Sequence, residues 1–128
     1  MKILLDTHSF LWFVYGDNKL SKKAIKTIEN PENSLLLSIA SIWELAIKIS
    51  INKLRIKGSL KDFISEETSK NGIRLFGIKE DHIYLLTQLP YFNKDPFDRL
   101  LVCQCKEEEI SIISADKRFD DYKINRIW

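Results

Sequence analysis

The sequence predicts an α/β fold with a central, mostly parallel sheet of about five strands flanked by helices. Two observations predict it: short apolar runs alternate with longer segments of helical periodicity, and the first and the clearest of these runs are followed directly by Asp6 and Ser114. The 128 residues contain no repeat and no linker, so we expect a single domain over residues 1–128. A chain of this length buries a sufficient core without disulfides or metal.

Five segments are predicted to be strands. Residues 2–5 form an apolar run that stops at Asp6, which is typical of a strand buried on both faces of a parallel sheet. Residues 110–113 form the clearest strand, and the last segment is expected at an edge of the sheet. The predicted strands are residues 2–5, 35–37, 74–78, 110–113 and 124–128.

Capping residues mark the beginnings of the predicted helices. Asp6 and Thr7 can cap a helix that runs to about Tyr15 and ends at Gly16. The next helices are capped by Ser21, by Ser38 or Ser41, and by Ser59. The predicted helices are residues 7–15, 22–29, 39–51, 60–70, 79–89 and 96–108, with a turn or short helix at 117–122.

The predicted helix over residues 39–51 is apolar nearly all round. Its polar residues Ser41, Glu44 and Lys48 recur at spacings that place them on one narrow stripe. We therefore expect this helix to be mostly buried. Burial of the Glu44 carboxylate is costly unless a positive group meets it.

The last long helix begins at an acidic motif. Pro96 suits the first helical position, so Asp95 falls at the N-cap and Asp98 in the first turn. Both carboxylates then lie at the electropositive end of the helix dipole. Taken alone, this is an ordinary capping arrangement.

Four acids from distant parts of the chain are predicted to meet. In parallel sheets, ligands bind beyond the carboxyl ends of the strands, where Asp6 and Asp116 are expected to lie. The helices that carry Glu44 and Asp98 begin at the same edge. Such a cluster repels itself and raises the pKa of its members unless cations compensate it.

Two explanations for the cluster stay open. One is a structural network of ion pairs with neighbouring cations, for which the candidates are Lys48, Lys94, Arg99 and Lys117. The other is Mg²⁺ or Mn²⁺, hard ions that take carboxylate oxygens and keep several waters. No Cys or His stands at ligand spacing, so zinc is not expected. We favour the metal site.

The composition limits the function further. The formal net charge of +2 is too small to indicate nucleic-acid binding by itself. No apolar run is long enough for a membrane span, and the first residues lack signal-peptide features, so we expect a cytoplasmic protein. Cys103 and Cys105 lie two apart on a predicted helix, point to nearly opposite sides, and are expected to be buried free thiols.

The chain resembles the PIN domain, and more closely the VapC-type toxins with Trp-Glu and Asp-Pro-Phe-Asp-Arg motifs. The resemblance covers nearly the whole chain and implies a three-layer fold and one nuclease domain over residues 1–128. At position 93, where this subgroup often has His, the chain has Asn93. The matching segments are Ile3-Leu4-Leu5-Asp6-Thr7, Ser38-Ile39-Ala40-Ser41-Ile42-Trp43-Glu44, Asp95-Pro96-Phe97-Asp98-Arg99 and Ser114-Ala115-Asp116.

The resemblance implies a Mg²⁺- or Mn²⁺-dependent endoribonuclease, the toxin of a type II toxin–antitoxin pair. The positions that match the family's acidic quartet are Asp6, Glu44, Asp98 and Asp116, of which Asp6 and Asp98 would be the strongest metal ligands. Thr7 and Ser114 would orient carboxylates, and Asp95 would be a helix cap first and an accessory acid second. Attack by metal-activated water would leave a 5′-phosphate and a 3′-hydroxyl.

Substrate and partner contacts are also implied. Lys48 and Arg99 are candidates for RNA phosphate, and the stretch from Lys48 to Lys61 is either a steering surface or simply a solvated basic face. His8 and His82 are expected to be non-catalytic. The aromatic residues between positions 10 and 15 are expected in the core or on a partner surface, with base stacking as the lesser alternative. A small antitoxin and a homodimer would be the protein partners.

Two other functions stay open. A phosphatase or phosphotransferase could use Asp6 as nucleophile, although the haloacid-dehalogenase pattern needs a second acid where His8 stands. A non-catalytic binding module could keep the PIN-like fold and lose the metal, although all four acids are present. A nuclease that cleaves DNA instead of RNA is the alternative most similar to the favoured function.

Overall fold

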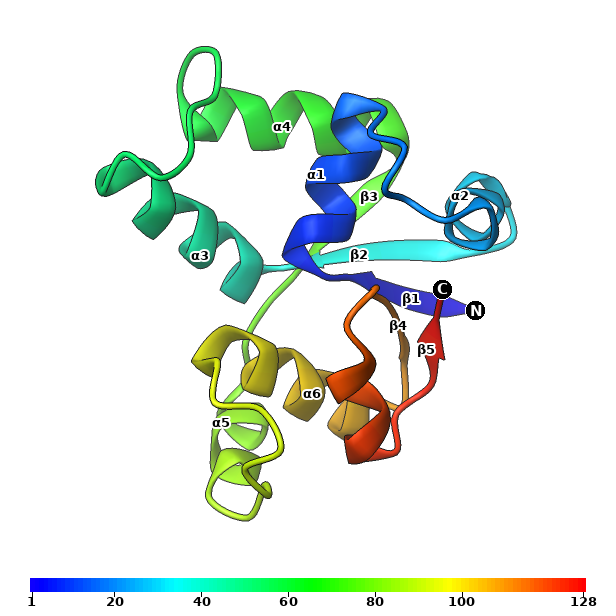
Figure 1. Ribbon diagram of the computed structural model, residues 1–128, viewed down its shortest axis with the longest axis vertical. Coiled ribbons are helices and arrows are strands. Elements are labelled where there is room, and N and C mark those ends of the chain that lie inside the picture. The colour runs from blue at the N-terminus through cyan, green and yellow to red at the C-terminus, as the bar shows by residue number, and fades with distance from the viewer.

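A five-stranded sheet, parallel throughout, forms the centre of the computed structural model, which describes residues 1–128 (Figure 1). The order of the strands is β3-β2-β1-β4-β5, so the segment predicted as the last edge strand does lie at an edge. The strands are β1 (Lys2–Leu5), β2 (Ser34–Ser38), β3 (Ile73–Phe76), β4 (Ser111–Ile113) and β5 (Arg126–Ile127). The predicted α/β fold is confirmed.

The helices lie in two layers, one on each face of the sheet (Figure 1). Helices α1, α2 and α4 cover one face, and α5, α6 and the 3₁₀ helix η1 cover the other. The helices are α1 (Thr7–Tyr15), α2 (Lys22–Glu29), α3 (Ile39–Ser50), α4 (Leu60–Asn71), α5 (Glu80–Leu86), α6 (Pro96–Glu108) and η1 (Lys117–Tyr122). None of them is long and apolar enough to cross a membrane.

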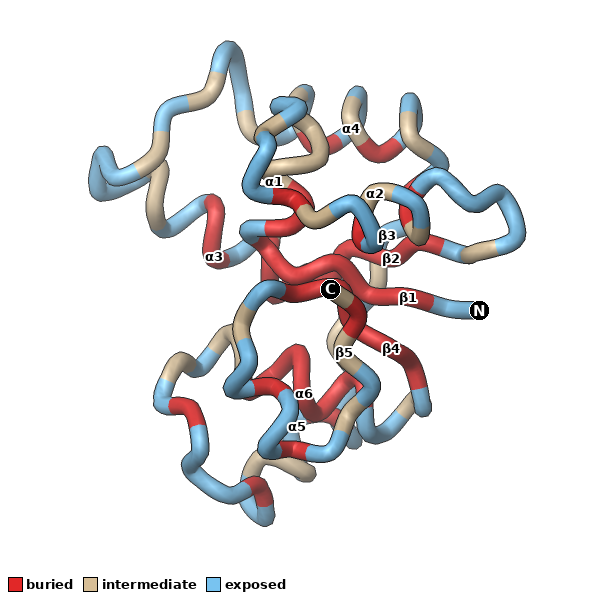
Figure 2. Tube along the Cα trace, turned by 45° about the vertical axis from the view of Figure 1, so that its right-hand side comes forward, coloured by how far each residue is buried: buried red, intermediate tan, exposed pale blue.

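The central strand β1 explains why both faces need cover. Its residues Ile3, Leu4 and Leu5 are all fully buried, with Ile3 and Leu5 in one apolar cluster and Leu4 in the other. This follows from the alternation of side chains along a strand. Figure 2 shows the buried residues concentrated in the strands and in α6.

The predicted caps place the ends of the helices. Asp6, Ser21, Ser38 and Ser59 are the N-caps of α1, α2, α3 and α4, and each side chain accepts a backbone hydrogen bond. Gly16 ends α1 with φ of 63°, a left-handed conformation that glycine adopts without strain. Asp6 is therefore fixed at the point where β1 ends and α1 begins.

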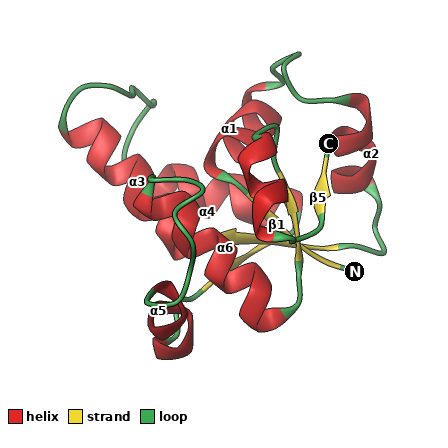
Figure 3. Ribbon diagram, turned by 60° about the horizontal axis from the view of Figure 1, so that its bottom comes forward, coloured by secondary structure: helices red, strands yellow, loops and turns green.

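The expectation that the helix over residues 39–51 is mostly buried was wrong. Ile39, Trp43 and Ile47 of α3 are 39%, 56% and 38% exposed, whereas Ser41 and Glu44 are almost fully buried. The helix extends beyond the sheet with one side free (Figure 3). Of its polar stripe, Glu44 packs inward and accepts from Thr7 of α1, whereas the Ser41 hydroxyl is buried without a hydrogen-bond partner.

The two cysteines behave as expected. Cys103 and Cys105 are buried free thiols of α6. Burial raises the pKa of Cys103 to about 11 and that of Cys105 to about 12. Both therefore stay protonated near neutral pH and belong to the core.

Candidate metal centre

The four predicted acids lie at the carboxyl-terminal edge of the sheet. Asp6 follows β1 directly, and Asp116 comes three residues after the end of β4. Glu44 lies in the second turn of α3, which follows β2, and Asp98 lies in the first turn of α6. Parallel strands place their carboxyl ends at one edge, so the four acids lie along the same edge.

Asp6 is buried at the centre of this edge. Its Oδ1 accepts a 2.8 Å hydrogen bond from the backbone N–H of Ser9. Burial raises the pKa of the Asp6 carboxyl, although hydrogen bonds from Ser114 and Ser9 act in the opposite direction. No Lys or Arg side chain pairs with Asp6, although the charge of His8 has a smaller lowering effect on the pKa of its carboxyl.

The charges of neighbouring acids raise the pKa of Asp98. Burial and, next, the charge of Asp95 raise the pKa of Asp98 to about 7, and the charges of Asp6 and Glu44 add to this effect. The Asn93 amide, which donates to Asp98 Oδ2 over 3.0 Å, opposes the shift. Mutual repulsion at this edge is what the predicted cluster requires.

Asn93, the departure from the motif of the resembling subgroup, contacts Asp95 and Asp98. It is buried, it donates to Asp98, and its own Oδ1 accepts from the backbone N–H of Asp95 over 2.9 Å. Asp95 in turn caps α6 by accepting from Phe97 and Asp98. This chain of contacts fixes the orientation of the Asp98 carboxylate.

Glu44 has both of the partners that the sequence offered. The Thr7 hydroxyl donates to Glu44 Oε1 over 2.9 Å, and Lys48 Nζ lies 2.7 Å from Glu44 Oε2. Thr7 thus contacts one of the four acids directly. Of the four candidate cations, only Lys48 forms an ion pair with one of the four acids.

Asp116 is paired with Arg118, a residue that the sequence analysis did not single out. Arg118 Nη2 lies 2.6 Å from Asp116 Oδ2, and its Nε donates to the same carboxylate. This contact holds the pKa of Asp116 below its usual range. The backbone N–H of Asp116 donates to Ser114 Oγ over 3.0 Å, so Ser114 lies between Asp6 and Asp116. The only sign of this ion pair in the sequence is that Arg118 stands two residues after Asp116.

Arg99 forms no ion pair with any of the four acids, and its contact with RNA phosphate stays a prediction. Its guanidinium is buried and donates to the carbonyl oxygens of Pro90 and Leu89 over 2.8 and 3.2 Å. It also lies 3.9 Å from the centre of the Tyr91 ring. Consecutive residues on a helix point about 100° apart, so Arg99 faces the loop while Asp98 faces the other acids. Arg99 therefore holds the loop before α6.

The donor set fits a hard divalent cation in its chemistry. All four side chains offer carboxylate oxygens, and the pair Asp6 and Asp98 has raised pKa values and no cationic partner. No three His, Cys, Asp or Glu side chains stand close enough together to hold an ion in this arrangement. Mg²⁺ is usually held by only one or two carboxylates plus waters, which this pair can supply.

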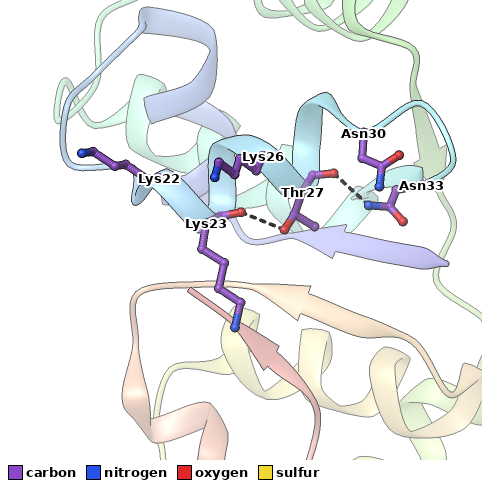
Figure 4. A pocket seen from close by; sticks show the side chains of 6 residues that line it. All are labelled: Lys22, Lys23, Lys26, Thr27, Asn30 and Asn33. Atoms are coloured by element: carbon purple, nitrogen blue, oxygen red, sulfur yellow. Dashed lines mark hydrogen bonds between the residues drawn. The ribbon is translucent and has the colours of Figure 1, made fainter.

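One hollow borders the acids. It measures about 250 Å³ and is lined by Asp6, His8, Trp12, Ala115 and Asp116. A second hollow, of about 400 Å³, lies on α2 and is lined by side chains that include Lys22, Lys23 and Lys26 (Figure 4). No candidate acid borders this second hollow, so we assign it no part in the site.

Arg55 and Lys57 of the basic stretch, and also His82, lie beside other residues than the four acids. Arg55 and Lys57 line a hollow together with acids of α4, namely Asp62, Glu66 and Glu67. His82 is fully buried and lies 3.0 Å from Glu108. Neither observation connects these residues with the four acids.

Several solved structures share this fold. One is VapBC2 from Rickettsia felis bound to a promoter DNA fragment, with 13% identity, a TM-score of 0.74, and coverage of 98% of this chain and 97% of that one. VapBC-1 from nontypeable Haemophilus influenzae matches with 14% identity, a TM-score of 0.66, and coverage of 98% and 96%. A toxin–antitoxin complex from Klebsiella pneumoniae matches with 14% identity, a TM-score of 0.58, and coverage of 90% and 87%.

Sequence comparison supplies the family. Among curated proteins, none matches this chain. The model of the PIN domain matches residues 3–125, a range that contains β2, β3, β4 and nearly all of β1. The match also includes all four acids, and the shared fold agrees with it. The protein belongs to the PIN domain family.

Proposed function

We propose that the protein is a Mg²⁺- or Mn²⁺-dependent endoribonuclease that acts as the toxin of a type II toxin–antitoxin pair. The observation that carries the proposal is the pair formed by the buried Asp6 and the half-buried Asp98. Both carboxyls have raised pKa values and neither has a Lys or Arg partner. The charge of Glu44 contributes to the raised pKa of Asp98. A divalent cation would relieve the repulsion within the pair of Asp6 and Asp98, in competition with the protons that the raised pKa values favour.

Each residue of the site has a defined part in this proposal. Asp6 and Asp98 hold the ion, with Glu44 and Asp116 acting directly or through water. Thr7 and Asn93 fix the orientation of Glu44 and Asp98 through their hydrogen bonds, as outer-shell partners generally do. When bound, the ion would activate a water for in-line attack and stabilise charge on the phosphate.

The substrate is an RNA phosphodiester. Lys48 reaches the acids and is partly exposed, so it can meet a phosphate at the rim of the site. Asp95 keeps its role as cap of α6 and acts on Asp98 through its charge. Because water rather than the 2′-hydroxyl attacks, the products carry a 5′-phosphate and a 3′-hydroxyl. The protein acts in the cytoplasm, where its substrate is found.

Protein partners cover the exposed side of α3. Ile39, Trp43, Ile47 and Ile51 recur every four residues along this segment and are exposed. A contiguous apolar stripe of this kind is typical of a protein–protein surface. We propose a small antitoxin and a second copy of the chain as its partners, which agrees with the toxin–antitoxin complex among the structures of the same fold.

The test is cleavage of a mixed pool of structured cellular RNA by purified protein freed of antitoxin. Reactions with Mg²⁺ or Mn²⁺ are compared with reactions in EDTA, for the wild type and for Asp6→Asn and Asp98→Asn. Asp81→Asn is the matched control, because Asp81 also lies in the first turn of a helix but outside the site. We expect discrete metal-dependent fragments that both site variants lose and the control keeps.

Two outcomes would contradict the proposal. Release of phosphate from small monoesters, with the RNA intact, would indicate a phosphatase with Asp6 as nucleophile. Failure to bind Mn²⁺ in calorimetry would indicate a binding module that keeps the fold without the metal. The 5′ and 3′ ends of any fragments then decide between attack by water and attack by the 2′-hydroxyl.

A further inference from the structure

The hollow beside the acids has an aromatic wall that the four carboxylates do not explain. His8 and Trp12 lie one turn apart on α1, with ring centres 5.8 Å apart and planes inclined by 35°. Both side chains line the hollow together with Asp6, Ala115 and Asp116. The His8 ring is exposed, so burial in the core is not its role.

Trp12 also contacts a second aromatic ring and a cation. Its ring centre lies 5.9 Å from that of Trp128, at an angle of 56° between the planes. The ammonium group of Lys19 lies 5.9 Å from the centre of the Trp12 ring. The indole is therefore a supported surface beside the hollow, with a cation close to it.

The size of the hollow limits what it can hold. Its volume of about 250 Å³ lies just below the usual range of pockets for small organic ligands, roughly 300–1,000 Å³. A single planar ring system suits this space. Ala115 is the smallest residue in the lining and is exposed, so a larger side chain there would fill the hollow without displacing core atoms.

Two cations near the hollow support RNA as the source of that ring, although neither is part of the lining. Arg118 is paired with Asp116, and the Lys19 ammonium lies close to the Trp12 ring. Aromatic side chains interleaved with cations are typical of sites that bind single-stranded nucleic acid by base stacking and phosphate contacts. The carboxylates of Asp6 and Asp116 place the proposed site of cleavage directly beside this surface.

We propose that the hollow lined by His8, Trp12 and Ala115 is a nucleobase subsite for the nucleotide beside the scissile phosphate. The base stacks on the two rings of α1, and its phosphate lies toward the acids. This inference rests on the proposed ribonuclease function. It adds a subsite on α1. The mechanism otherwise involves only Thr7 of this helix and its N-cap, Asp6.

The test is a binding titration by fluorescence anisotropy in the inactive Asp98→Asn background, at constant salt. The probes are a short uridine oligoribonucleotide and an abasic oligomer of the same length and charge. The site variants are His8→Ala and Ala115→Leu, because Trp12 packs on Trp128 and its truncation could disturb folding. Tyr84→Ala is the control, since Tyr84 is an exposed aromatic residue on α5.

We expect both site variants to weaken binding of the base-bearing probe by about tenfold, which is within the range found for loss of one base stack. Binding of the abasic probe should be weak and equal in all variants, and Tyr84→Ala should match its parent with both probes. Equal affinity of the parent for the two probes would overturn the subsite. So would unchanged binding in Ala115→Leu, because a filled hollow cannot receive a base.

The outcome is distinguishable from failure of the ribonuclease proposal. If the wild type cleaves RNA with metal but base-bearing and abasic probes bind alike, only the subsite is wrong. If the wild type cleaves no RNA with either metal, the ribonuclease proposal fails. Capture of the base-bearing probe by an otherwise inactive protein would then show a nucleic-acid-binding module.

Discussion

Replacement of Asp98 by asparagine should change how the stability of the protein depends on pH. The pKa of Asp98 is raised to about 7 from an ordinary 3.8, because of burial, the charge of Asp95 and the charges of Asp6 and Glu44. A raised pKa means that the folded protein binds this proton more tightly than the unfolded chain does. Stability from this group is therefore complete below pH 4 and is lost as the pH rises through 7.

The magnitude follows from the shift. A difference of about 3 pKa units, at 1.36 kcal/mol each, corresponds to at most about 4 kcal/mol lost between pH 4 and pH 8. Partial exposure of Asp98 reduces this figure through solvent screening. The amide of the Asp98→Asn variant carries no charge, and its oxygen can still accept from the Asn93 amide. The variant should therefore be more stable than the wild type at pH 8 and nearly equal at pH 4.

Urea denaturation at pH 4, 6 and 8 measures this effect, with Asp81→Asn as the control for loss of an acid from the first turn of a helix. Addition of Mg²⁺ at pH 8 should stabilise the wild type, since an ion that binds only the folded state adds to its stability. It should stabilise Asp98→Asn much less. A wild type and an Asp98→Asn variant with parallel pH dependence would refute the reasoning, because Asp98 would then not share the field of the other acids.

Three further predictions concern residues around the site. Arg99→Met should lower the free energy of unfolding by about 1–3 kcal/mol, because the buried Leu89 carbonyl loses its donor while the Pro90 carbonyl keeps only the Tyr122 hydroxyl, yet Mn²⁺ binding in calorimetry should persist; loss of Mn²⁺ binding in a folded variant would contradict this role. Thr7→Val should weaken Mn²⁺ binding by about 10-fold or more through the loss of an orienting hydrogen bond to Glu44, and unchanged binding would remove Thr7 from the site. Ile47→Glu should leave the unfolding free energy within about 0.5 kcal/mol, since Ile47 is exposed, while reducing self-association in analytical ultracentrifugation; an unchanged association state would place the dimer interface elsewhere.

The positions of the four acids could be predicted because each depends on local sequence and topology. Asp6 follows an apolar run, and Asp98 follows a Pro at the first position of a helix, and both signals are read directly from the chain. A parallel sheet then brings the strand ends together without further information. The caps at Ser21 and Ser59 were predictable for the same reason.

Other parts of the site depend on side-chain directions that the sequence does not reveal. The helix that carries Glu44 is apolar nearly all round, so periodicity favoured burial, whereas the structure leaves Trp43 and Ile47 exposed. Arg99 follows Asp98 directly but points to the loop carbonyls of Leu89 and Pro90. The contacts of Asn93 and Arg118 with the acids likewise needed the three-dimensional arrangement.

The distribution of cations among the acids bears on both explanations that the sequence left open. Glu44 has Lys48 and Asp116 has Arg118, so half of the cluster is a network of ion pairs. Asp6 and Asp98 have no such partner, and burial makes their shared negative charge costly. A divalent cation that binds this pair displaces no resident cation, whereas one that recruits Glu44 or Asp116 competes with an existing contact. We therefore expect the first ion to bind at Asp6 and Asp98 and to leave the Lys48–Glu44 and Arg118–Asp116 ion pairs intact.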